Sequence, residues 1–122
     1  MYFRMSTLVI LAGLLMGAAS GELQLSSPEL IQEMQDPAQS LVIVDVREPE
    51  LFKAGHIPGA INIPYPDAKT RALEELTPDQ NIVFVCHGGP MGAELASILA
   101  AKGYKTVRNL TGGMRQWSGP LE

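Results

Sequence analysis

The residues best suited to do chemistry surround the single cysteine of the chain. Cys86 follows a short apolar run, Ile82 to Val85, and precedes a glycine-rich segment that ends at Gly92. Helical spacing of apolar residues predicts a helix over 93–102. A thiol on a strand-to-helix turn lies near unpaired backbone N–H groups and the positive end of a helix dipole, which stabilise a thiolate and an adjacent anion. The pattern therefore indicates nucleophilic sulfur chemistry.

The loop after Cys86 carries main-chain donors that can converge on one anion. The candidate substrate-binding residues are His87, Gly88, Gly89, Met91 and Gly92. Glycines let the backbone curl, whereas Pro90 has no N–H and leaves a gap in the ring of donors. We expect the sulfur to be open to solvent and surrounded by these donors. The alternative is a small apolar side chain buried at the end of a strand.

The histidines and one charged pair have roles that the sequence leaves open. His87 either hydrogen-bonds a substrate anion or faces solvent, and His56 is interpreted as a turn residue bonded to nearby backbone. One cysteine and two histidines show no zinc-ligand spacing, so no metal is expected. Asp45 and Arg47 either touch the substrate or form an ion pair that supports the site, and the second interpretation is favoured.

Strand and helix patterns alternate along the chain. Apolar runs predict strands at 41–44, 60–63 and 82–85 and around Val107. Helices are predicted after Ser27, which is taken as an N-cap, and at 48–53, 71–76 and 93–102. A last helical turn carries Trp117. Such alternation implies an α/β fold, with parallel strands and helices on both faces of the sheet. Ligands of these sheets bind beyond the carboxyl ends of the strands, where Asp45 and Cys86 both fall.

Composition limits the domain count and the partners. The chain has 122 residues, which fits one domain, and its net charge of −4 includes no dense run of Lys or Arg that would suggest nucleic acid.

Residues 1–21 have the pattern of a secretory signal peptide: Arg4, a short apolar run and a small-residue end. The run is shorter than the ~20 residues that cross a bilayer. We therefore expect residues 22–122 to form one exported domain, periplasmic or secreted, with a retained membrane anchor as the alternative. In an oxidising compartment a lone thiol such as Cys86 is either sealed in the core or kept for its reactivity.

Four segments, in order, resemble the signatures of the rhodanese-like family. They are Val44-Asp45-Val46-Arg47-Glu48-Pro49, the run from Gly55 to Pro64, Val85-Cys86-His87-Gly88-Gly89, and Gly112-Gly113-Met114 with Trp117. The resemblance runs from about Ser26 to Trp117. It implies a central parallel sheet of about five short strands flanked by helices on both faces, and a sulfurtransferase that needs no cofactor. In that family the cysteine thiolate takes the outer sulfur of thiosulfate or a persulfide, and the resulting persulfide passes it to cyanide or a thiol acceptor.

One position departs from the family pattern. Active members usually carry Arg or Lys at the fifth position after the cysteine, where this chain has Met91. A charge-assisted hydrogen bond is roughly twice as strong as a neutral one, so we expect weakened thiosulfate binding and a donor less charged than thiosulfate.

Other classes of function are weighed against sulfur transfer. The main alternative is a catalytically weak or inactive module that binds a partner protein. A phosphatase is disfavoured, because Gly92 stands where such enzymes carry an arginine, and disulfide exchange would need a second cysteine.

Overall fold

Five parallel strands form one sheet in the order β1-β5-β4-β2-β3. The strands are β1 (Gln24–Leu25), β2 (Leu41–Asp45), β3 (Ile61–Asn62), β4 (Asn81–Val85) and β5 (Thr106–Leu110). This computed structural model describes residues 23–122, and the signal peptide predicted at 1–21 lies outside them. The expectation of an α/β fold with about five short parallel strands is confirmed.

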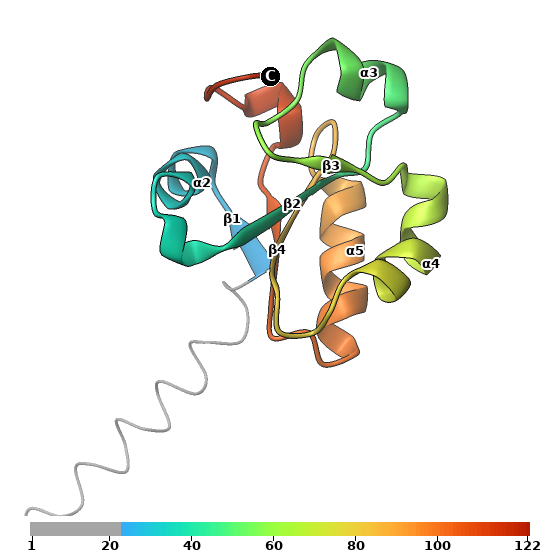
Figure 1. Ribbon diagram of the computed structural model, residues 1–122. Helices are drawn as coiled ribbons and strands as arrows, with labels where there is room; N and C mark the ends of the chain where they lie inside the picture. The colour runs from blue at the N-terminus through green and yellow to red at the C-terminus, as the bar shows by residue number, and fades with distance from the viewer. Residues whose placement is uncertain (1–22) are drawn as a thin grey trace, which may run out of the picture.

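Helices cover both faces of the sheet. They are α2 (Ser27–Met34), α3 (Pro49–Ala54), α4 (Tyr65–Glu75) and α5 (Pro90–Ala101), with the 3₁₀ helices η2 (Pro37–Gln39) and η3 (Gly113–Gln116). In Figure 1, α4 and α5 lie on one side of the sheet and α2 on the other. Within residues 23–122, no helix is both long and apolar enough to span a membrane.

The central strands are buried on both sides, which explains their continuous apolar sequences. In β4, Ile82 and Phe84 pack with Leu95 of α5, whereas Val83 and Val85 belong to the cluster on the α2 face. Alternate residues of a strand point to opposite faces, so a strand covered twice needs apolar residues at every position.

Two helices begin earlier than the sequence patterns predict. Helix α4 starts at Tyr65 and not at residue 71, and α5 starts at Pro90 and not at residue 93. Prolines at 64, 66 and 90 suggest interruptions, yet Pro66 and Pro90 occupy the first turn of their helices. Backbone N–H groups there have no intrahelical acceptor, so proline costs no hydrogen bond.

The first helix is capped one residue before the predicted position. Ser26, and not Ser27, is the N-cap: its Oγ accepts a hydrogen bond from the Glu29 N–H at 3.3 Å. The Glu29 carboxylate accepts one in return from the Ser26 N–H at 2.8 Å. This reciprocal pair is a capping box.

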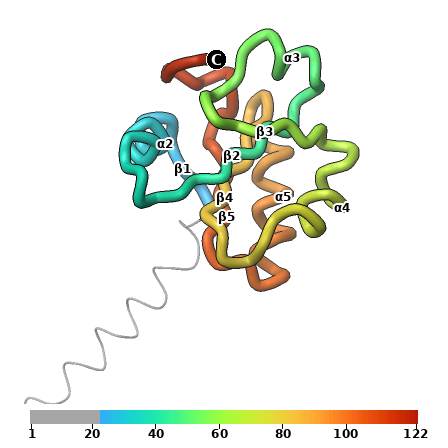
Figure 2. The backbone as a smooth tube through the Cα atoms, in the orientation of Figure 1, coloured from blue at the N-terminus to red at the C-terminus, as the bar shows by residue number. Residues whose placement is uncertain are grey.

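The sheet register brings the two candidate segments to one edge. Asp45 at the end of β2 is paired with Val85 at the end of β4, and the Val46 N–H donates to the Val85 carbonyl at 2.8 Å. Cys86 is the next residue after Val85. The carboxyl-terminal tail also closes on this half of the fold, because Glu122 and His56 exchange two backbone hydrogen bonds; Figure 2 shows the end of the chain beside the α3–β3 connection.

Candidate active site

The sulfur of Cys86 receives two main-chain hydrogen bonds from the start of α5. The Gly89 N–H lies 3.1 Å from Sγ, and the Gly92 N–H lies 3.5 Å from it. Gly89 is the N-cap of α5 with a φ of 122°, a conformation that favours glycine. Two of the five predicted donors thus face the sulfur. Among residues 23–122, no other hydrogen bond to Sγ is present.

The prediction that the Cys86 thiol is open to solvent is wrong. Cys86 is only 1% exposed and packs in the same cluster as Phe84 and Leu95. The physical reason is the curl of the loop, which lays the first turn of α5 over the end of β4 and draws two amides onto the sulfur. The loop itself does reach solvent, because His87 and Gly88 are partly exposed. Any molecule that reaches the sulfur therefore has to approach through this loop.

The segment after β5 fixes the backbone of the cysteine loop. The Met114 N–H donates to the Cys86 carbonyl at 2.8 Å, and the Arg115 N–H donates to the His87 carbonyl at 3.0 Å. Gly113 has a φ of 58°, and a Cβ placed on it would lie 2.5 Å from the Cys86 carbonyl oxygen. Only glycine permits this approach, so the Gly112-Gly113 pair serves to hold η3 against the loop.

Asn109 of β5 packs against Gly92 in the cysteine loop, and the sequence analysis did not single it out. It lies on β5, is 2% exposed, and donates from Nδ2 to Gln24 Oε1 at 3.2 Å. Its Oδ1 faces the Cα of Gly92, where a Cβ would overlap it. Within the described part of the chain this oxygen has no hydrogen-bond partner. A single asparagine in a strand carries no sequence signal for such a role.

Asp45 and Arg47 form the buried ion pair that the sequence favoured. Arg47 Nη2 lies 2.8 Å from Asp45 Oδ2 and also donates to the Gly55 carbonyl at 2.8 Å. The Arg47 N–H donates to Asp45 Oδ1 at 3.0 Å. These bonds tie the end of β2 to the end of α3. That this ion pair supports the candidate site during a reaction remains a prediction.

His87 is directed toward an acidic partner that the sequence analysis missed. Its Nε2 lies 2.9 Å from Glu48 Oε1. A hydrogen bond from its own backbone N–H, and then the bond to His87, lower the pKa of Glu48, so this carboxylate is ionised at neutral pH.

His56 behaves as predicted: its Nδ1 lies 2.8 Å from the Phe52 carbonyl oxygen. Met91 is 37% exposed on the first turn of α5.

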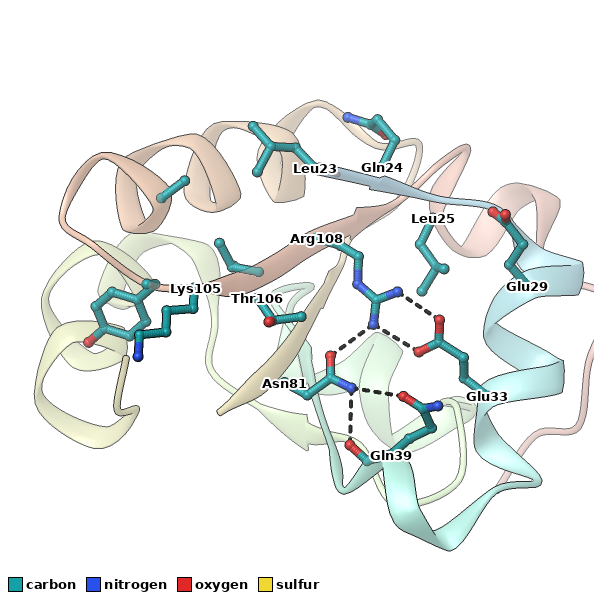
Figure 3. Close-up of a pocket in the computed structure, with 13 residues that line it drawn as sticks. Leu23, Gln24, Leu25, Glu29, Glu33, Gln39, Asn81, Lys105, Thr106 and Arg108 are labelled. Atoms are coloured by element: carbon teal, nitrogen blue, oxygen red, sulfur yellow. Dashed lines mark hydrogen bonds and ion pairs between the residues drawn. The ribbon is translucent and has the colours of Figure 1, made fainter. Parts of the chain in front are cut away.

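A pocket of about 620 Å³ lies away from the cysteine (Figure 3). It is lined by Asn81 and Thr106 at the amino ends of β4 and β5, and by Glu33 of α2. Arg108 in this pocket makes a double hydrogen bond with Glu33, at 2.7 and 2.8 Å, which neutralises its charge. Because Cys86 follows the opposite end of β4, this pocket is not part of the thiol site. Among residues 23–122, no group of three His, Cys, Asp or Glu side chains could hold a metal ion.

A parallel α/β domain with a cysteine at the end of its central strand, beneath the first amides of a helix, defines the class of this protein. The rhodanese-like domain model matches residues 26–120, and the chain belongs to that family.

Relatives and solved structures agree with this assignment. The chain is 36% identical over 110 residues to YrkF of Bacillus subtilis, covering 87% of this chain but 59% of YrkF. It is 32% identical over 92 residues to the thiosulfate sulfurtransferase GlpE of Pseudomonas syringae, covering 74% of this chain and 82% of GlpE. The rhodanese-like domain of an Anabaena protein superposes with a TM-score of 0.74 at 28% identity, over 83% of this chain and 79% of that one.

Proposed function

We propose that this protein is a sulfurtransferase that carries sulfane sulfur on Cys86. The observation that supports this most is the pair of N–H groups, of Gly89 and Gly92, that converge on Sγ. They stabilise negative charge on the sulfur, first as a thiolate and then as a persulfide. The name of GlpE, a thiosulfate sulfurtransferase, is consistent with this activity.

The reaction has two halves. In the first, the Cys86 thiolate attacks the outer sulfur of thiosulfate or of a persulfide; the S–S bond of the donor breaks, and sulfite or a thiolate leaves with the electron pair. In the second, cyanide or a thiolate attacks the outer sulfur of the Cys86 persulfide and regenerates the thiolate. The chemistry needs no metal and no cofactor. In the proposed setting, residues 1–21 direct export and residues 22–122 act in the periplasm or outside the cell.

Two-substrate kinetics test this proposal. With thiosulfate and cyanide varied together, a covalent intermediate predicts parallel double-reciprocal lines, since sulfite leaves before cyanide binds. Intersecting lines, or no thiocyanate above the rate of a blank without protein, would contradict the proposed mechanism.

The burial of Cys86 favours one alternative from a different class. A thiol that is 1% exposed could be a packing residue in a module that only binds a partner protein. Such a module would release no sulfite from thiosulfate, so the same assay distinguishes the two functions.

The close approach of Gly92 to Asn109 yields a prediction about the sulfur site. Alanine at position 92 would normally stabilise a helix by about 1 kcal/mol. Here its Cβ would overlap Asn109 Oδ1 and push the Gly92 N–H away from Sγ. We expect the G92A variant to lose about tenfold in kcat/KM for sulfur transfer, the size of one hydrogen bond to a charged group.

A second substitution separates this clash from other effects of the alanine. In the double variant G92A/N109A the obstructing oxygen is gone, so most of the lost activity should return. A G92A variant with the kcat/KM of the wild type would show that the Gly92 N–H does not serve the sulfur.

A further inference from the structure

The loop from Cys86 to Gly92 contains no residue with a permanent positive charge. The two hydrogen-bond donors to the Cys86 sulfur are neutral amides, and Met91 presents an uncharged thioether on the first turn of α5. The outer sulfur of thiosulfate is attached to an anionic group, and a thiolate that attacks it brings a second negative charge. A cation close to the loop would therefore lower the repulsion between the two reactants.

Three other basic side chains, those of Arg47, Lys69 and Arg71, are already engaged by acidic partners. Arg47 is held by Asp45, as described above. Lys69 Nζ lies 3.2 Å from Glu94 Oε2, and Arg71 Nε lies 2.7 Å from Glu75 Oε2.

Arg115 is differently placed. Its backbone N–H is bonded to the His87 carbonyl, and its guanidinium lies against the loop: a Cβ on Gly88 would be 3.2 Å from Arg115 Nη1. Its side chain is exposed. The ion pairs of Arg and Lys found among residues 23–122 involve Arg47, Lys69, Arg71 and Arg108, and not Arg115. The guanidinium thus lies at the cysteine loop with its charge available to an anion.

We propose that Arg115 is the donor-binding residue of this protein and supplies the charge that Met91 does not. This inference rests on the proposed sulfurtransferase function and specifies its substrate class, an anionic sulfane-sulfur donor. The guanidinium binds the oxyanion end of the donor while the outer sulfur meets Cys86. When the S–S bond breaks, the electron pair passes to the leaving sulfite or sulfinate, whose charge stays beside Arg115. The expectation of a donor less charged than thiosulfate rested on Met91 alone. With Arg115 at the cysteine loop, that reason no longer applies.

The charge of the donor provides the test. Thiosulfate is a dianion, whereas methanethiosulfonate, CH₃SO₂S⁻, is a monoanion with the same kind of transferable sulfur. In the R115Q variant we expect kcat/KM for thiosulfate to fall about tenfold, mainly through KM, and kcat/KM for methanethiosulfonate to fall less. The R115K variant keeps the charge and should recover most of the thiosulfate activity.

Arg71→Gln is the matched control, because it removes one arginine charge from the surface, where Arg71 pairs with Glu75 one turn further along α4. This control should leave kcat/KM unchanged for thiosulfate and for methanethiosulfonate. Equal losses for both donors in R115Q, or an unchanged KM for thiosulfate, would overturn the role of Arg115 while leaving sulfur transfer by the wild type intact. If the wild type itself forms no persulfide with either donor, the proposed function fails and the role of Arg115 fails with it.

Discussion

Replacing Cys86 with serine is expected to abolish sulfur transfer, with a fall in kcat of at least about 1000-fold. A serine hydroxyl is far less acidic than a thiol and forms no persulfide, so both halves of the reaction lose their covalent carrier. The measurement is thiocyanate formation from thiosulfate and cyanide by the C86S variant and the wild type at equal concentration.

The C86S variant should retain its fold, so a loss of activity would not be due to unfolding. The exchange replaces one atom by a smaller one, and the N–H groups of Gly89 and Gly92 can donate to the hydroxyl instead of to Sγ. Thermal unfolding followed by circular dichroism would confirm this. Turnover within tenfold of the wild type in a folded C86S variant would show that another group does the chemistry.

Replacing Arg47 with methionine should cost about 3–5 kcal/mol in the free energy of unfolding, because it leaves a buried carboxylate without its cation. Asp45 is 1% exposed and Arg47 is 8% exposed. The lost guanidinium also held the Gly55 carbonyl, so the end of α3 is no longer tied to the end of β2. Urea denaturation of the R47M variant and the wild type measures the difference.

Two further variants show whether burial of the charge is the cause. The R71M variant removes an exposed pair with Glu75 and should cost far less, since exposed ion pairs contribute little to stability. The double variant D45N/R47M is uncharged and retains an acceptor for the backbone N–H at position 47, so it should recover part of the stability lost in R47M. A loss in R47M no larger than in R71M would mean that this pair does not stabilise the fold.

Much of the fold follows from local sequence patterns. The runs 41–44 and 82–85 are apolar at every position because β2 and β4 are covered on both faces, and their ends position Asp45 and Cys86 as predicted. The favoured ion pair of Asp45 and Arg47 is present, because two residues that flank one position can bond locally. Strand β1 was not predicted: its two residues, Gln24 and Leu25, are too few to show a period and pair only with β5.

The contacts of the site that join distant segments were not predictable from one sequence. His87 meets Glu48, 39 positions earlier in the chain. Arg115 reaches Gly88 only because η3 folds back on the cysteine loop, and Asn109 reaches Gly92 only because β5 lies next to β4. The burial of Cys86 has the same origin, since the packing of α5 over the strand end decides it. Motif spacing identifies the candidate nucleophile, whereas tertiary packing decides its neighbours.

The intact mass of the protein after incubation with thiosulfate tests the central claim most directly. We expect the wild type to gain one sulfur atom, to release one equivalent of sulfite, and to return to its original mass when cyanide is added. The added sulfur should be found on the peptide that contains Cys86. An unchanged mass at saturating thiosulfate, or a gain that survives cyanide, would contradict the account.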